Sequence, residues 1–174
     1  NARSEMAGLE PVYQVKGKVY RSGEYGPEGS SAVTQSASAN GYRLPTEAEW
    51  QWAERGGVES RGYLFSGSDD LNEVGWFSRN AKGAVEDLGS LVHQTLAGLG
   101  TWPVGQKGRN ELELSDMSGN VWEWCWDLNS PYRRLSGGSW ISIAVDCAFS
   151  YRYFNSPDIR IPYYGLRIAR SSEP

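Results

Sequence analysis

The chain has 174 residues, a formal net charge of −4 and a hydrophobic content of 39%. This length suits one domain with a single core, and the composition excludes an intrinsically disordered chain. The sequence contains no basic run and no apolar run of 18 residues. We therefore expect neither a nucleic-acid partner nor insertion of this chain into a membrane.

The N-terminal third predicts one firm helix. Residues 1–9 are typical of the end of a helix whose start is missing, and residues 11–23 are typical of a short hairpin. In the helix predicted over residues 47–55, Thr46 is a suitable N-cap and Glu49 completes a capping box. Gly56 ends this helix, and Trp50 and Ala53 are expected on its buried side.

The rest of the chain predicts short strands between long loops. Residues 58–110 favour loops, with short strands near residues 63–65 and 101–105. "VWEWCWD", residues 121–127, alternates as a strand, with Trp122, Trp124 and Trp126 on one face. Further strands are predicted in "RLSGGSW", "CAFSYRYF" and "YGLRIAR". One helix with many short strands indicates an irregular α+β domain.

The cysteines and the histidine limit the metal and disulfide chemistry. Two cysteines, Cys125 and Cys147, are too few for a disulfide framework or a four-thiolate zinc site. The sequence favours two buried thiols and leaves a bond between them open. The single histidine, His93, excludes a three-histidine metal site within this chain and is expected in a loop or on the surface.

Four stretches in order resemble the formylglycine-generating-enzyme, or sulfatase-modifying-factor, domain. They are "NGYRLPTEAEWQWAERGG", "TWPVGQKGRNELELSDMSGNVWEWCWD", "RRLSGGSW" and "YGLRIAR", which together span about residues 41–170. The resemblance implies the formylglycine-generating-enzyme subclass of the C-type lectin fold, an α+β fold with short strands, few helices and long irregular loops. It also implies one domain over residues 1–174 that lacks its N-terminal part.

The enzymes of this family bind copper through two cysteines, five residues apart, after the "GGS" motif. Here Cys147 matches the second cysteine, but Ser142 stands at the first. A serine hydroxyl stays protonated near neutral pH and is a poor ligand for a soft metal ion. Relatives that use iron need three histidines. We therefore expect no catalytic residues and no required cofactor, with an altered or degenerate oxidase as the alternative function.

The resemblance also implies a structural calcium ion at the "SGNVWEW" turn. Its oxygen ligands would come from Ser118, Gly119, Val121 and Glu123. The alternative is that "SGN" forms only a tight turn and that Glu123 makes an internal hydrogen bond. The four residues are too few for a calcium shell of 6–8 oxygens, so the sequence leaves both alternatives open.

Residues 137–167 resemble the variable region of proteins that are diversified by retroelements. Such regions keep a fixed frame and often carry asparagine codons, AAC, which mutation of adenines turns into NNC. The resemblance implies a scaffold role for Trp140, Cys147, Arg152, Asp158 and Arg160. It implies ligand binding by the variable positions, which are Ile141, Ser142, Ile143, Val145, Asp146, Phe149, Tyr151, Tyr153, Phe154, Asn155, Ser156, Ile159, Ile161, Pro162, Tyr163 and Tyr164.

The residue types in this segment agree with that resemblance. NNC codons cannot encode Met, Trp, Lys, Glu or Gln, and none of these occurs in residues 141–172. In the first 140 residues they number 32. A buried strand would also avoid most of these residues, so an alternative is that the Ile and Tyr side chains belong to the core.

Together these features predict a variable protein that binds a macromolecular ligand, expected to be a protein, through an exposed surface. Tyr suits such a surface because it offers a large rigid contact area with only two side-chain torsions to freeze. The resemblance implies display at a cell surface or outside the cell, or attachment as a lipoprotein through a segment absent here. A sugar-binding lectin is a further alternative, but the chain has no "EPN" motif.

Overall fold

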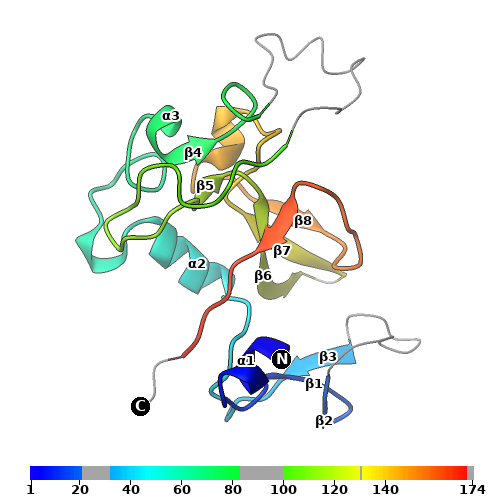
Figure 1. Cartoon of the computed structure of the whole chain (residues 1–174). Coiled ribbons are helices and arrows are strands. Elements are labelled where there is room, and N and C mark those ends of the chain that lie inside the picture. Colours follow the sequence, from blue (N-terminus) through cyan, green and yellow to red (C-terminus); the bar gives the residue numbers. More distant parts are fainter. Residues whose placement is uncertain (21–31, 83–99, 130, 172–174) are drawn as a thin grey trace.

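The computed structural model describes residues 1–20, 32–82, 100–129 and 131–171 (Figure 1). His93 and residues 21–23 of the predicted hairpin lie outside these ranges. The N-terminal part forms α1 (Ala2–Met6), β1 (Tyr13–Val15), β2 (Lys18–Val19) and β3 (Val33–Gln35). The strands make an antiparallel sheet in the order β2-β1-β3. Lys16 and Gly17 connect β1 to β2 with φ of 49° and 73°, as a tight hairpin turn requires.

Helix α2 (Glu47–Glu54) confirms the predicted capping box. The Thr46 hydroxyl accepts a hydrogen bond from the Glu49 backbone N–H at 3.2 Å, and the Glu49 carboxylate accepts one from the Thr46 N–H at 2.8 Å. The helix buries Trp50 against Met117 and Cys125, with Ala53 partly buried beside them. This packing fixes α2 against the main sheet (Figure 1).

The region after α2 holds elements that the sequence did not indicate. It forms η2 (Gly57–Glu59), α3 (Leu71–Val74) and β4 (Gly75–Trp76), and β4 pairs in parallel with β5 (Ser118–Gly119). The strands predicted at residues 63–65 and 101–105 are wrong, because the described part holds only an isolated bridge between Phe65 and Ser68 and a turn in their place. Two-residue strands and a one-turn helix are too short to produce a periodic pattern.

The main sheet has four strands in the order β8-β7-β6-β9. They are β6 (Trp122–Asn129), β7 (Tyr132–Ser136), β8 (Tyr153–Asn155) and β9 (Tyr164–Leu166). Strand β9 runs parallel to β6, with Trp122 opposite Tyr164. The middle and the C-terminal end of the segment 137–167 thereby contribute strands to one sheet.

The strand predicted through "CAFSYRYF" is wrong at its first half. Cys147 lies in the 3₁₀ helix η4 (Ala144–Cys147), and only Tyr153 and Phe154 of that stretch join β8. The cause is the turn at Gly137 and Gly138, which have φ of 93° and 76° and end β7 at Ser136. A Cβ on Gly138 would clash with the Cys147 side chain, so this turn places η4 against the glycines.

Candidate ligand-binding surface

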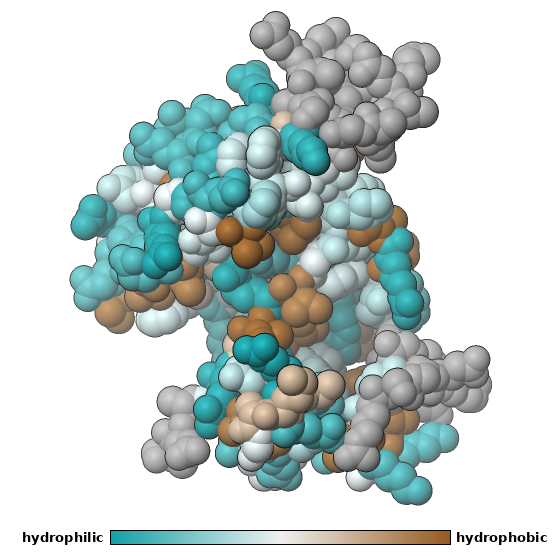
Figure 2. Space-filling model, in the orientation of Figure 1, coloured by the Kyte–Doolittle hydropathy of each residue, from teal (hydrophilic) through white to brown (hydrophobic). Residues whose placement is uncertain are grey.

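The predicted variable positions lie mostly on the surface. All of them except Ser142 are at least partly exposed. Four large side chains are the most open, with exposed fractions of 45% for Ile143, 58% for Val145, 38% for Tyr151 and 39% for Ile159. Figure 2 shows hydrophobic side chains, coloured brown, over β9 and the chain that follows it and over the loop between β8 and β9. Such exposed apolar side chains in one segment are typical of a binding surface.

Ser142 is the exception, because it does not lie on the surface as predicted. Its side chain is buried, and its hydroxyl accepts a hydrogen bond from the Ser139 N–H at 3.1 Å and lies 3.2 Å from the Ser139 hydroxyl. The Ser142 N–H in turn donates to the Ser139 carbonyl at 2.9 Å. Ser142 therefore braces the turn after β7 and does not face a ligand.

The predicted scaffold residues divide into two groups. Trp140 and Cys147 are buried, with exposed fractions of 3% and 0%, whereas Arg152, Asp158 and Arg160 are exposed. The Arg152 Nη1 donates to Glu47 Oε1 at 2.6 Å. Arg152 thus ties the variable segment to the first turn of α2, and Asp158 and Arg160 do not form part of a buried frame.

Two frame residues outside the segment were missed by sequence reasoning. Arg134 is buried in β7, and its Nη2 donates to the Tyr151 carbonyl at 3.0 Å. Its Nη1 lies 3.5 Å from Glu47 Oε1, so one carboxylate holds both Arg134 and Arg152. In the sequence, the available sign of this site was Glu47 in the first turn of the helix. Its arginine partners could not be named, because only the fold brings residues 47, 134 and 152 together.

An aromatic layer supports the surface from below. Trp122 of β6 lies 5.1 Å from Tyr153, and Trp124 lies 5.4 Å from Tyr164, measured between ring centroids. Tyr164 also accepts a hydrogen bond from the Asn155 amide at 2.7 Å and donates one to the Tyr153 hydroxyl at 3.2 Å. Burial raises the pKa of Tyr164, so its phenol stays neutral at physiological pH. The strand predicted to have one aromatic face therefore packs against variable tyrosines.

The residues at the family's copper position do not fit a copper ion. Cys147 is fully buried, and burial raises the pKa of its thiol to about 12. This pKa describes the thiol without a metal ion, and the misfit lies at the first position of the pair, where Ser142 offers a hydroxyl in place of a thiolate. The Ser142 hydroxyl is engaged by Ser139, as described above. Cys125 is also a buried free thiol with a pKa raised to about 12 by burial, so the cysteines form no disulfide.

The calcium ligands named from the sequence fit the ion only in part. Val121 and Glu123 line a cleft beside Arg167, whereas Ser118 and Gly119 do not. Both Glu123 oxygens accept hydrogen bonds from Arg167, at 2.9 Å each, and the Trp50 indole N–H donates to Oε2 at 2.7 Å. The internal hydrogen bond of Glu123, the alternative to calcium binding, is therefore present, and the four-residue calcium set stays a prediction.

Asp116 supplies a better oxygen at the same cleft. It lines the cleft with Glu123 and Val121, and its Oδ1 is buried without a hydrogen-bond partner. Its Oδ2 accepts from the Gly105 N–H at 2.6 Å. A buried carboxylate oxygen without a partner is costly, and a cation would satisfy it. The unpartnered Asp116 Oδ1 is therefore a candidate cation ligand at this cleft that the predicted set did not include, whereas both Glu123 oxygens already accept hydrogen bonds from Arg167.

The geometry can be compared with known proteins. Residues 10–172 match the family model of the sulfatase-modifying factor enzyme 1-like domain. "Chaperone protein LppX" of Paenibacillus barcinonensis is 36% identical over 98% of this chain and 65% of that protein. "Inactive C-alpha-formylglycine-generating enzyme 2" of Mus musculus is 32% identical over 76% of this chain and 44% of that protein.

Solved structures agree with the family match. The crystal structure of CarF superposes with a TM-score of 0.75 at 28% identity, over 99% of this chain and 62% of that chain. Treponema denticola variable protein 1 superposes with a TM-score of 0.70 at 28% identity, over 96% of this chain and 64% of that chain. The fold is therefore the C-type lectin fold of the formylglycine-generating-enzyme type, as predicted. The chain spans less than two thirds of each of these four proteins.

Proposed function

The chain belongs to the sulfatase-modifying factor enzyme 1-like family and shares its fold with a variable protein, and from this premise we propose that it is a ligand-binding variable protein. Residues 137–167 form its variable region, and a retroelement diversifies the exposed positions within that region. The fixed frame keeps the fold, while the variable side chains recognise a macromolecular partner. Residues 1–174 act as one domain in this proposal.

One observation carries the proposal. Within the same segment, the fixed residues Trp140 and Cys147 are buried. The variable positions between them, Ile141, Ile143 and Val145, reach the surface. A segment with interleaved buried and exposed positions can change the second set without disturbing the first. A core strand would instead bury its large apolar residues on a regular period.

The chemistry of the surface indicates a protein as the partner. Tyr151, Ile143 and Ile159 expose apolar area, and the partly exposed Asp146, Asn155 and Ser156 alternate with them along the sequence. Protein interfaces combine an apolar centre with a polar rim in this way. The net charge of −4 does not favour nucleic acid. Because a diversified binder acts on partners outside the cell, we place the chain at the cell surface or outside it. No described helix has the length and apolar character needed to cross a membrane.

We further propose that the chain is not an enzyme. The family's cysteine pair is incomplete, because Ser142 stands at the position of its first thiolate and the Ser142 hydroxyl is hydrogen-bonded to Ser139. The test is incubation of the purified chain with copper, oxygen and a cysteine peptide, read by mass spectrometry. The proposal expects no aldehyde product, and copper-dependent conversion of the cysteine would support the oxidase alternative instead.

We also propose a structural calcium ion at the "SGNVWEW" turn, with the unpartnered Asp116 carboxylate added to the ligands predicted from Ser118, Gly119, Val121 and Glu123. It is tested by thermal unfolding in calcium or in chelator, with Asp116→Asn as the variant. Calcium should raise the unfolding temperature of the natural chain by several degrees, since an ion that binds only the folded state stabilises it. The shift should be lost in Asp116→Asn. Equal unfolding temperatures in calcium and chelator would contradict the proposal.

Sequencing tests the diversification. The gene should lie beside a reverse transcriptase and a near-copy of the variable region that carries AAC codons. Deep sequencing of this gene in a population of the source cells should find substitutions at the variable positions and not in residues 33–82, which serve as the internal control. Substitutions spread evenly over both regions, or absence of the reverse transcriptase and of the near-copy, would contradict the proposal.

A display experiment tests binding. The exposed variable positions are encoded by NNC codons on phage, and the library is selected on immobilised lysozyme. A matched library randomises exposed residues of the opposite part of the chain, such as Glu59, Arg61 and Glu113. The proposal expects specific binders from the first library only. Failure of the first library, or equal success of both, would count against this surface as the binding site.

A further inference from the structure

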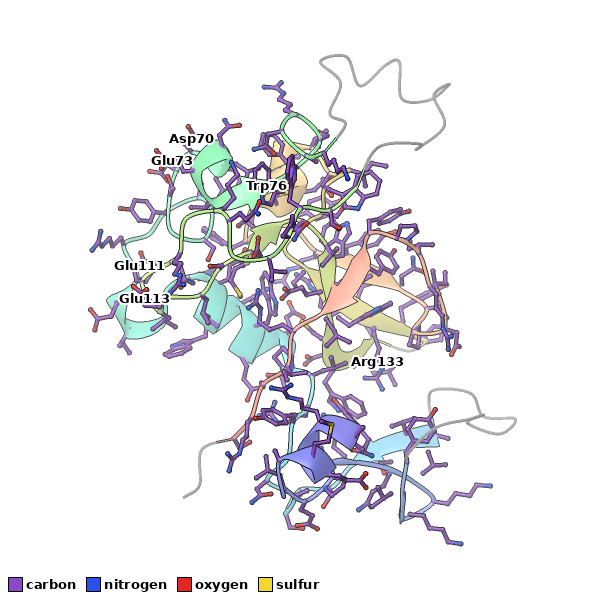
Figure 3. The ribbon with its side chains drawn as sticks, viewed as in Figure 1. Asp70, Glu73, Trp76, Glu111, Glu113 and Arg133 are labelled. Atoms are coloured by element: carbon purple, nitrogen blue, oxygen red, sulfur yellow. The ribbon has the colours of Figure 1, made fainter. Side chains whose placement is uncertain are left out.

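A small cavity lies between the N-terminal sheet and the end of the main sheet. Its volume is about 230 Å³, and its walls include Tyr13, Tyr20, Trp124, Trp126, Arg133 and Pro157. Figure 3 labels Arg133 at the end of the main sheet that faces the N-terminal sheet. Except for Pro157, these residues lie outside the variable region. The cavity is therefore a feature of the fixed part of the chain, at the border of the variable surface.

Half of the residues that line the cavity are aromatic, namely Tyr13, Tyr20, Trp124 and Trp126. Tyr13 of β1 and Trp126 of β6 lie 5.3 Å apart between ring centroids, at 37°. Trp124 contributes to the cavity and also packs against Tyr164 of the variable region. Flat aromatic walls favour a planar or branched apolar group, because such groups stack on rings and displace water from them.

Arg133 gives the cavity its charge. The side chain is 7% exposed, and its guanidinium carbon lies 4.0 Å from the centroid of the Trp126 ring. Its Nη1 donates to the Trp126 carbonyl. Burial lowers the pKa of Arg133, while Tyr13 and Asp127 oppose that shift. The charged form is therefore held in a poorly solvated place.

Arg133 differs from the other arginines that hold this fold together. Arg43, Arg134, Arg152 and Arg167 each form an ion pair with a glutamate. Arg133 forms none with any residue that the structure describes. Asp127, the carboxylate that influences it electrostatically, accepts a hydrogen bond from the Glu47 N–H at the start of α2. A buried cation without an anion is costly unless a ligand supplies the anion.

We propose that this cavity binds a carboxylate carried on an aromatic or branched aliphatic body. The Arg133 guanidinium would hold the carboxylate, since its planar fork of donors matches two carboxylate oxygens. The aromatic walls would hold the apolar body. A free small acid and the C-terminal residue of a peptide both have this chemistry. Because the cavity is built from fixed residues, it would take the same ligand whatever the variable residues are, and the proposal does not depend on diversification.

The test uses isothermal titration calorimetry of the whole chain with phenylacetate and with its neutral analogue phenylacetamide. We expect phenylacetate to bind at least tenfold more tightly. The same acid-over-amide preference is measured for the peptide Gly-Ser-Gly-Phe with a free or an amidated C-terminus. Binding of both acids indicates a site that admits a chain end, and binding of phenylacetate alone indicates a free small acid.

Two variants test whether Arg133 causes the preference for the acid over the amide. Arg133→Met should reduce the acid-over-amide ratio to about one. Arg109→Met, which removes an exposed arginine outside the cavity, should leave the ratio unchanged. The comparison of acid and amide in the natural chain needs no variant, so the proposal stays testable if Arg133→Met does not fold. Equal binding of acid and amide, absence of binding by both acids, or a preference that survives in Arg133→Met would overturn it.

Discussion

The fixed and the variable positions of residues 137–167 share one segment but differ in what surrounds them. Trp140 is buried, Gly138 lies against Cys147 in the core, and Arg167 forms an ion pair with the buried Glu123. Tyr151, Ile143 and Val145 have much of their surface in solvent. Within this segment, the fold therefore depends on the few contacts made by the buried residues. The other side chains are free to serve recognition.

The largest expected effect is on the fixed side, at Arg167. Its Nε and Nη2 donate to the Glu123 carboxylate, and Nη2 also donates to the Ser115 carbonyl at 2.8 Å. Arg167→Ala would leave the buried Glu123 without its cation and should lower the free energy of unfolding by about 3 kcal/mol. Urea unfolding measures the change, with Arg160→Ala as the exposed control from the same segment. If Arg167→Ala lowered the free energy of unfolding no more than Arg160→Ala does, the ion pair with Glu123 would not stabilise the fold.

The next effect separates backbone conformation from packing. Gly138 and Gly105 have nearly equal φ, 76° and 77°, but a Cβ on Gly138 would clash with Cys147, whereas a Cβ on Gly105 would meet no atom within 4 Å. Alanine at either position strains the backbone, and only alanine at 138 also overpacks the core. Gly138→Ala should therefore destabilise the chain by about 2 kcal/mol more than Gly105→Ala, as measured by urea unfolding. Equal losses would show that η4 moves freely away from the turn.

A third effect depends on pH and concerns the core beneath the frame. Glu54 is buried, and neither of its carboxylate oxygens has a hydrogen-bond partner among the described residues. Burial raises the pKa of Glu54 well above its usual value. The unfolded state therefore ionises first, and the stability present below the unfolded pKa of about 4.3 is lost as the pH rises toward the folded pKa.

Glu54→Gln tests this effect. The variant should be more stable than the natural chain by about 1–2 kcal/mol at pH 8, and the advantage should shrink toward pH 5. Chemical unfolding at both pH values gives the comparison. The exposed Glu113→Gln serves as the control and should change neither value. A constant difference between pH 5 and pH 8 would refute the raised pKa as its cause.

The smallest effects are expected on the variable side. Tyr151→Ser should change the free energy of unfolding by no more than about 0.5 kcal/mol, since it removes a surface side chain. Tyr164→Phe removes the hydrogen bonds to Asn155 and Tyr153 and should cost about 1 kcal/mol. Thermal unfolding ranks the two. If Tyr151→Ser destabilised the chain as much as Arg167→Ala, the distinction between fixed and variable positions would fail.

Local signals predicted the helix and the strand that anchor the fold. The capping box at Thr46 and Glu49 and the alternation over residues 121–127 depend on neighbours in sequence, and both elements were found as predicted. The elements α3, β4 and β5 were missed because their stability comes from pairing across more than 40 residues. The 3₁₀ helix at Cys147 was missed because the Gly138 turn, and not the local residue pattern, sets its direction.

The variable positions could be named from the sequence because a family resemblance and a codon pattern mark them. The residues that hold these positions in place could not be named from the sequence. Glu47 holds Arg134 and Arg152 only because α2 lies beside β7 and the start of β8. Ser142 was placed among the variable positions because the frame marks it so, yet its hydrogen bonds to Ser139 bury it. The burial of a variable position thus depends on contacts that the residue pattern does not mark, such as the turn between Ser139 and Ser142.

The measurement that tests the central claim most directly compares two display libraries for resistance to protease. One library randomises the exposed variable positions, and the other randomises the frame residues Gly138, Trp140, Cys147 and Arg167. Protease cleaves unfolded chains, so the surviving fraction reports folding. Our account predicts that most members of the first library survive and that few members of the second do. Comparable survival in the two libraries would contradict it.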